Sequence, residues 1–295
     1  MEMSKQLKVY TKEVEAVIEQ YLPAGEGPQK TIFEAMNYSV RAGGKRLRPL
    51  LMRETYRLFG GTGDEIGPFM AAIEMIHTSS LIHDDLPCMD NDELRRGLPT
   101  AWVKYGYDMA VLAGDALLIY AIETASKAFL VTNYPDRVGR AVTLLAEKSG
   151  IYGMIGGQVV DVELTNRPVS PGQLEFIYRL KTGALLEAAM GIGALLGGAS
   201  QGQLKQVMDL ASGIGYAFQI QDDILDVTGT PESLGKPVMS DEKNSKTTYV
   251  TQNGLEKAQA DVRQISEDAV RCLDGLPGEN PFLEALIRML IKREK

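Results

Sequence analysis

The chain has 295 residues, of which 44% are hydrophobic and 24% are charged, as in an ordinary globular protein. Its 39 acidic and 31 basic side chains give a net charge of −8, which argues against nonspecific binding to nucleic acid or to an anionic membrane. The two cysteines, Cys88 and Cys272, form no CxxC pair, which excludes a disulfide framework as the basis of the fold and favours a reducing cytoplasm.

The N-terminal stretch is expected to be a helix, because apolar residues recur at intervals of three and four from Leu7 to Tyr21. The same stretch is charged throughout and lacks the apolar core of a signal peptide. No uncharged apolar run along the chain approaches the ~18 to 20 residues of a membrane span. We therefore expect a soluble, cytoplasmic protein with no stable membrane insertion.

Helix-forming sequence continues along the rest of the chain. Segments rich in Ala, Leu, Ile, Met, Glu and Lys alternate with loop signals, and no run of alternating β-branched residues occurs. The pattern predicts an all-α fold of roughly ten or more helices. Residues 111–129 and 181–198 are apolar over most of their helical circumference, so both are expected inside a bundle of helices rather than on its edge.

A first cluster of carboxylates follows an apolar run, in the sequence HDDLPCMDND. Asp84 and Asp85 are adjacent, and the next aspartate, Asp90, lies six residues after Asp84. Pro87 lies within that interval, where it disturbs regular helix and lets Asp90 turn back towards Asp84.

A second cluster, QDDILD, also ends an apolar segment. Asp222 and Asp226 are four residues apart, so they share one helical face and can hold a cation between them, while Asp223 points away from that face. One such cluster is more often a solvated acidic surface, but two clusters that both end apolar helices favour a site. Carboxylate ligands favour Mg²⁺ before Ca²⁺, and Mg²⁺ is commonly shared with substrate phosphates. An acidic protein could thus hold a polyanion through metal ions.

Basic residues that could hold phosphate stand near these clusters. Each alone is more often a solvated surface charge, but two groups are singled out by their positions, one behind a pair of glycines in GGKRLRP and one directly after the first aspartate cluster. The candidates are Lys45, Arg46, Arg48, Arg95, Arg96, Lys181 with Thr182, Lys236 and Lys246.

Taken together, these motifs resemble those of the trans-isoprenyl diphosphate synthases. The resemblance rests on GGKRLRP, HDDLPCMDND with RRG, GQVVD, KTG, FQIQDDILD and LGKPVMSDEKNSK, whose order and spacing match from about residue 38 to 250. It implies a single polyprenyl synthetase domain over residues 1–295, built as a bundle of long helices around a central active-site cavity and usually forming a homodimer. It also implies that an allylic diphosphate is extended with isopentenyl diphosphate and pyrophosphate is released. About three Mg²⁺ ions would assist, and Mn²⁺ could replace them.

The resemblance also implies roles for individual residues. The metal ligands would be Asp84 and Asp90 on one wall and Asp222, supported by Asp226, on the other. The allylic diphosphate would be held by Arg95, Lys181, Thr182, Gln219, Lys236 and Lys246. Isopentenyl diphosphate would be held by Lys45, Arg48, His77 and Arg96. The catalytic set would be Asp84, Lys181, Thr182, Gln219 and Asp222.

The implied chemistry accounts for these residue types. Departure of diphosphate creates an allylic cation, so cations must stabilise the leaving charge and water must be excluded. The sequence shows no Ser–His or Cys–His arrangement, and the released pyrophosphate is therefore the expected base. His83 is interpreted as a supporting residue next to Asp84.

The product length depends on side chains one helical turn before Asp84. Such a turn rises ~5.4 Å, close to one extended prenyl unit. In similar bacterial farnesyl diphosphate synthases the fifth residue before the first aspartate is commonly aromatic, whereas this chain has Ser79 followed by Ser80. The missing floor favours a C20 product over C15, with Met75 or Ile76 as a deeper floor, or Met109 on the next helix. The alternatives are a C15 product limited by a residue elsewhere and a product longer than C20.

Two rival functions use the same fold. A terpene cyclase would ionise a diphosphate without adding isopentenyl diphosphate, and the sequence argues against it because GGKRLRP, His77 and Arg96 serve a second substrate. A non-catalytic subunit of a heteromeric prenyl synthase would have lost metal ligands, whereas both aspartate clusters are intact.

Overall fold

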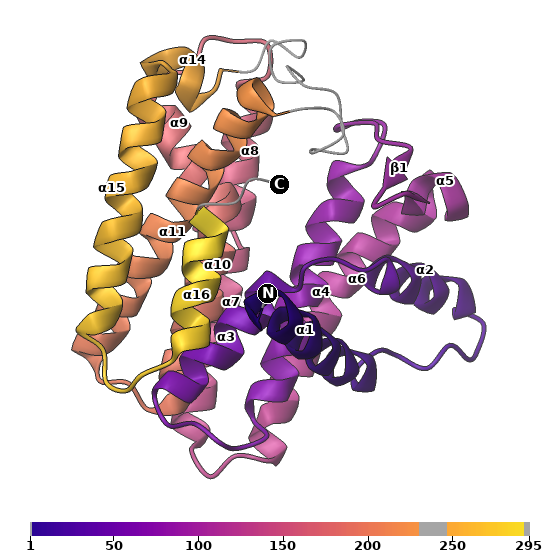
Figure 1. The fold of residues 1–295 in the computed structure, drawn as a ribbon. Coiled ribbons are helices and arrows are strands. Elements are labelled where there is room, and N and C mark those ends of the chain that lie inside the picture. Colours follow the sequence, from indigo (N-terminus) through magenta and orange to yellow (C-terminus); the bar gives the residue numbers. More distant parts are fainter. Residues whose placement is uncertain (1, 230–246, 292–295) are drawn as a thin grey trace.

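The computed structural model describes residues 2–229 and 247–291 (Figure 1). Within these ranges the chain is helical apart from one antiparallel ribbon in which Leu94 pairs with Pro99 and Arg95 with Leu98. The elements are α1 (Glu2–Gln20), α2 (Lys30–Arg41), α3 (Leu47–Leu58), α4 (Ile66–Asp84), β1 (Leu94–Arg95), β2 (Leu98–Pro99), α5 (Ala101–Tyr105), α6 (Tyr107–Ser126), η1 (Lys127–Leu130), α7 (Pro135–Ser149), α8 (Met154–Glu163), α9 (Pro171–Ile177), η2 (Tyr178–Gly183), α10 (Ala184–Gly197), α11 (Gln201–Thr228), α14 (Tyr249–Asn253), α15 (Leu255–Asp274) and α16 (Pro281–Ile291). The all-α prediction is confirmed.

The centre of the bundle is formed by α10, which packs against α3, α7 and α11. Every residue from Ala184 to Leu196 is buried, as expected for a segment that is apolar on all sides. Next to it, α4 is buried along most of its length and packs mainly on α6 (Figure 1). These buried helices form rigid walls and hold the polar side chains of the site in place.

The prediction for residues 111–129 was wrong for the single chain, because α6 lies at the edge of the bundle. One face of α6 is buried through small residues such as Ala113 and Ala121. The opposite face is apolar yet open, with Leu112 54% exposed and Ile119 74% exposed. The spacing of apolar residues predicts that a helix face is apolar. It does not predict whether other helices of the same chain bury that face.

The two ends of the described chain pack into the same core. The Tyr10 ring of α1 meets the Phe282 ring of α16 edge to face, with ring centroids 4.6 Å apart. Val14 of α1 and Ile287 of α16 are fully buried. The terminal helices therefore contribute to the bundle that holds the site.

Two helical stretches would be long and apolar enough to cross a membrane if length and composition alone decided. The stretch Pro171–Gly197 is 78% buried inside the fold, which identifies it as a core segment. The stretch Tyr107–Leu130 is 39% buried and contains the open apolar face of α6. Burial in the core thus explains why the first stretch is apolar. The second stretch has an apolar side that the described part of this chain leaves exposed.

Candidate active site

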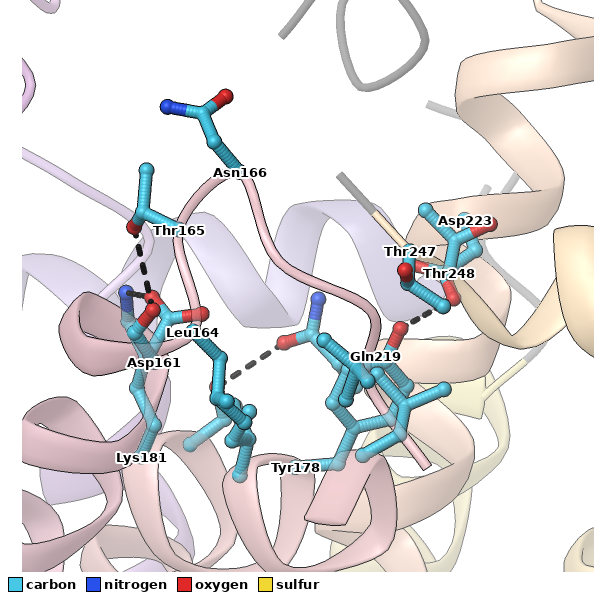
Figure 2. A pocket seen from close by; sticks show the side chains of 14 residues that line it. Asp161, Leu164, Thr165, Asn166, Tyr178, Lys181, Gln219, Asp223, Thr247 and Thr248 are labelled. Atoms are coloured by element: carbon cyan, nitrogen blue, oxygen red, sulfur yellow. Dashed lines mark hydrogen bonds and ion pairs between the residues drawn. The ribbon is translucent and has the colours of Figure 1, made fainter. Parts of the chain in front are cut away.

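A cavity of about 760 Å³ lies between α4, α6, α8 and the η2–α10 segment. It adjoins a smaller pocket of about 140 Å³ that also involves α11, and Lys181 and Thr182 line both (Figure 2). Of the residues selected from the sequence, the larger cavity is lined by Arg48, His77, Ser79, Ser80, His83, Asp84, Lys181 and Thr182. Gln219 lines the smaller pocket.

The first aspartate cluster folds as its proline suggested. Helix α4 ends at Asp84, and the chain turns back so that the Asp90 N–H donates to the Asp84 carbonyl at 2.9 Å. Gln158 Nε2 of α8 donates to Asp84 Oδ1 at 2.6 Å. Burial raises the pKa of Asp84, Lys181 opposes this shift, and the nearby carboxylate of Asp90 adds to it. A half-buried carboxylate beside a second carboxylate would be stabilised by a cation.

Arg95 is held within this cluster. Its Nε donates to Asp85 Oδ1 at 2.6 Å, and its Nη2 lies 3.4 Å from Asp92 Oδ2. Burial raises the pKa of Asp85 although Arg95 lowers it. The guanidinium therefore stands beside the aspartates, and Asp85 is engaged as its partner.

Lys181 and Thr182 lie in η2, a π-helical turn inserted between α9 and α10. Such turns are rare and are often found at functional sites. A Cβ atom on Gly157 of α8 would lie 2.2 Å from the Lys181 backbone nitrogen, and one on Gly215 of α11 would lie 2.6 Å from the Gly183 Cα. The π-turn is therefore held between two helices that approach it at glycines.

The side chains of the π-turn are held on both sides (Figure 2). Lys181 Nζ lies 2.6 Å from Asp161 Oδ2, and Thr182 Oγ1 donates to Gln219 Oε1 at 2.9 Å. Burial alone would lower the pKa of Lys181, but the charges of Asp161 and Asp84 raise it above its ordinary value. Lys181 is thus a fixed positive charge between the first aspartate cluster and α11.

The second aspartate cluster lies near the C-terminal end of α11. Asp223 is buried and accepts hydrogen bonds from Tyr178 Oη at 2.5 Å and from the Tyr249 N–H at 2.8 Å. It therefore joins η2 to the start of α14. Although the sequence placed Asp223 away from the shared face of Asp222 and Asp226, its side chain lines the smaller pocket together with Lys181 and Gln219. Asp222 is half-buried and Asp226 is 3% exposed. The predicted phosphate-binding residues Lys236 and Lys246 lie outside the described residues.

A group of cations lies close to His77 of α4, which lines the larger cavity together with Arg48. A Cβ atom on Gly44 would lie 2.8 Å from Arg96 Cζ, so the glycine lets the loop approach the guanidinium. Arg48 Nε is buried and has no hydrogen-bond partner in the described part of the chain. Burial lowers the pKa of His77 well below its ordinary value, and the charges of Arg48, Arg96 and Arg46 lower it further. The structure places Lys45 in the same loop, one residue after Gly44.

His77 is expected to make the protein sensitive to acid. It is neutral in the folded state, whereas in the unfolded chain it binds a proton below about pH 6.5. The unfolded state therefore binds more protons in this range, and stability falls as the pH drops below ~6.5, by about 1 to 2 kcal/mol at pH 5. In His77→Gln the loss of stability between pH 7 and pH 5, measured by urea unfolding, should be smaller by that amount. An identical loss in wild type and His77→Gln would contradict this, and His83→Gln is the matched control.

His83 lies against α6 at a close approach of the two helices. Its Nε2 is 3.2 Å from the Val111 carbonyl oxygen, and a Cβ atom on Gly114 would lie 2.0 Å from the same nitrogen. His83 thus packs α4 onto α6 one residue before Asp84, which agrees with its interpretation as a supporting residue.

Two residues of the site were missed as individual functional residues. Gln158 contacts Asp84, and Asp161 contacts Lys181, both from α8. They are three residues apart in GQVVD, a spacing that puts them on one helical face, and this was the signal that could have identified them.

Met75, proposed from the sequence as a deeper floor, does not line the cavity. Met75 and Ile76 are fully buried in the core, and Met109 is not among the lining residues either. Ser79 and Ser80 do line it, and Ser79 Oγ has no hydrogen-bond partner among the described residues. Position along a helix predicts the depth of a side chain, but its direction depends on which neighbours pack against it.

Within residues 2–229 and 247–291, no three Asp, Glu, His or Cys side chains converge to hold a metal ion by themselves. This arrangement nevertheless fits Mg²⁺, which binds through one or two carboxylates while waters and substrate phosphates complete its octahedron. The raised pKa of the half-buried Asp84 next to Asp90 fits a site that gains a cation with its substrate.

The comparisons with known proteins agree with this geometry. The family model described as polyprenyl synthetase matches residues 29–274. The chain belongs to the polyprenyl synthetase family. It is 42% identical to a farnesyl diphosphate synthase of Geobacillus stearothermophilus, over 95% of this chain and 94% of that protein. It is 47% identical to a chloroplastic geranylgeranyl pyrophosphate synthase of Capsicum annuum, over 83% of this chain and 66% of that protein.

The solved structures extend the likeness to the whole fold. A geranyltransferase from Helicobacter pylori, complexed with magnesium and isoprenyl diphosphate, is 32% identical and matches with a TM-score of 0.82 over 97% of this chain and 95% of that one. The fold is therefore that of the isoprenoid synthases. As a polyprenyl synthetase with such relatives, the chain is an enzyme, a short-chain prenyltransferase.

Proposed function

We propose that the enzyme condenses isopentenyl diphosphate with C5, C10 and C15 allylic diphosphates, releases pyrophosphate, and ends mainly at geranylgeranyl diphosphate, C20. The observation that carries the proposal is a tail-sized cavity of about 760 Å³ whose lining includes the carboxylate of Asp84, the fixed ammonium group of Lys181 and the guanidinium of Arg48. Two anionic headgroups require two cationic sites, and a prenyl chain requires an apolar cavity with an open end.

The metal ligands we propose are Asp84 and Asp90 on α4 and the turn after it, and Asp222 with support from Asp226 on α11. When bound, about three Mg²⁺ ions, replaceable by Mn²⁺, would supply positive charge to the departing diphosphate. Gln158 orients the Asp84 carboxylate through its hydrogen bond.

The allylic diphosphate would lie against the π-turn. Lys181 presents a fixed ammonium group, and Thr182 and Gln219 hold each other in place beside it. Arg95 stands next to the aspartates and adds a second cation. These groups are positioned before substrate arrives, so they favour the charge that develops as the diphosphate leaves.

Isopentenyl diphosphate would bind at the group formed by Lys45, Arg48, His77 and Arg96. Arg48 is half-buried and its Nε has no hydrogen-bond partner among the described residues, so an anion would stabilise it. His77 is neutral there and can donate a hydrogen bond from its ring. No side chain is assigned as the base, and the proton lost after bond formation would go to the released pyrophosphate.

The product assay tests this function. Purified protein, Mg²⁺ and isopentenyl diphosphate are incubated separately with C5, C10 and C15 allylic diphosphates, and the products are resolved by mass. Accumulation of C20 from all three starters is expected. Absence of any elongation by folded protein would overturn the proposal, and a hydrocarbon formed without isopentenyl diphosphate would indicate a terpene cyclase.

Ser79 is expected to be the reason that the chain can grow beyond C15. Ser79→Tyr places a ring in the cavity one turn below Asp84 and should shift the main product from C20 to C15. Ser79→Ala keeps the cavity open and should leave C20 as the product, which makes it the matched control. The products of both variants are compared by mass, and an unchanged C20 product in Ser79→Tyr would remove Ser79 from the length-determining residues.

We propose a homodimer that covers the open apolar face of α6. Leu112 and Ile119 on α6 and Ile151 and Tyr152 before α8 are 54% to 74% exposed, a patch typical of association surfaces. Because the enzyme is 32.3 kDa, light scattering should give a mass near twice that value. A mass equal to a single chain at micromolar concentration would contradict the homodimer.

Two further assignments belong to the same proposal. Residues 1–295 would form one domain, as the packing of α1 and α16 into one core supports. The enzyme would act in the cytoplasm, which its two free cysteines, Cys88 and Cys272, favour.

A further inference from the structure

The register of α4 against α6 gives the depth of each level of the cavity. Near the mouth, Tyr107 Oη lies 3.2 Å from Cys88 Sγ, and one turn further along α6 the Val111 carbonyl oxygen lies 3.2 Å from His83 Nε2. The two helices therefore run in opposite directions along the cavity. A step of four residues towards the N-terminus of α4 therefore reaches the same depth in the cavity as a step of four residues towards the C-terminus of α6.

At the level of Ser79 and Ser80 this register places Asp115 on α6, and all three residues line the cavity. None of these side chains is large enough to block a prenyl chain. On the opposite walls, Met154 lies one turn before Gln158, which contacts Asp84 at the mouth, so Met154 flanks the upper tail. The cavity is thus unobstructed at the level of Ser79.

Leu118 is the residue of α6 that lines the cavity furthest from the mouth. Its neighbours face elsewhere, since Leu117 is fully buried in the core and Ile119 is 74% exposed on the outer face. By the register it lies level with Met75 and Ile76, whose side chains point into the core and leave the cavity. At this level, Leu118 is therefore the large side chain that α4 and α6 present to the cavity.

We propose that Leu118 is the floor that determines product length, an inference that rests on the proposed chain-extension function. By the register, Leu118 lies three residues beyond Asp115, about 4.5 Å further along α6, which is close to one extended prenyl unit below Ser79. A ring at the level of Ser79 is expected to stop the chain at C15. A floor one unit deeper therefore corresponds to C20.

The test compares the products of Leu118→Ala and Leu118→Phe with those of wild type, starting from the C15 allylic diphosphate. Removing three carbons from the floor should raise the ratio of C25 to C20 product at least tenfold, and the larger ring should lower C20 in favour of C15 from shorter starters. Leu118→Met, with similar volume, is the matched control and should keep the wild-type ratio. Circular dichroism and thermal melting identify any variant that fails to fold.

The double variant Ser79→Tyr/Leu118→Ala shows whether the two residues act in order. The ring introduced at position 79 should stop the prenyl chain before it reaches position 118. The double variant should therefore give the same C15 product as Ser79→Tyr alone. A wild-type product ratio in folded Leu118→Ala would overturn the floor assignment while leaving the enzyme a synthase. Wild-type enzyme that stops at C15 would also overturn it, whereas no elongation by wild type would overturn the proposed function itself.

Discussion

Asp84→Asn should lower kcat by about a thousandfold while leaving the fold intact. The substitution removes the carboxylate charge that is proposed to bind the metal ions shared with the diphosphate. Asparagine has the same shape, and Gln158 can still donate to its Oδ1. Burial and the charge of Asp90 already raise the pKa of Asp84, so neutralising it should leave the thermal midpoint unchanged or higher. A purely structural carboxylate would give the opposite result, with lost stability and modestly reduced activity.

The matched control is Glu93→Gln, an exposed carboxylate in the same acidic segment. It should retain wild-type kcat and wild-type dependence on Mg²⁺ concentration. Steady-state kinetics over a Mg²⁺ series and a thermal melt of each variant provide the measurements. Activity of Asp84→Asn within tenfold of wild type would exclude Asp84 from the metal ligands.

The sequence predicted those features that depend on local pattern. Helical periodicity and composition predicted the all-α fold, and Pro87 predicted the break at which Asp90 returns to Asp84. In each case the relevant physics involves residues within two helical turns of each other.

Features that depend on packing between distant segments were missed. The π-turn at Lys181 follows from contacts with Gly157 and Gly215, which no pattern around residue 181 reveals. The exposed face of α6 is apolar in the same way as a buried one, so composition could not distinguish them. Met75, expected from the sequence as a deeper floor, is fully buried in the core and does not line the cavity, since α4 is covered there by other helices.

Gly157→Ala should damage the site through this packing, although residue 157 touches no proposed ligand. The added Cβ would lie 2.2 Å from the Lys181 backbone nitrogen and 2.8 Å from the Leu180 carbonyl carbon. Backbone atoms cannot rotate away, so α8 or the π-turn must shift, at a cost of about 1 to 3 kcal/mol. A displacement of ~1 Å at a positioned group such as Lys181 costs on the order of a hundredfold in rate.

The control for Gly157→Ala is Gly202→Ala, another helical glycine, whose added Cβ would meet nothing within 4 Å. There the loss of backbone freedom in the unfolded chain should stabilise the protein by about 0.4 to 1 kcal/mol and leave kcat unchanged. Urea unfolding and kcat are measured at a temperature where both variants are folded. Equal stability and activity in the two variants would mean that α8 can move without displacing Lys181. A loss confined to Gly157→Ala would identify the contact between α8 and the π-turn as the feature that positions this lysine.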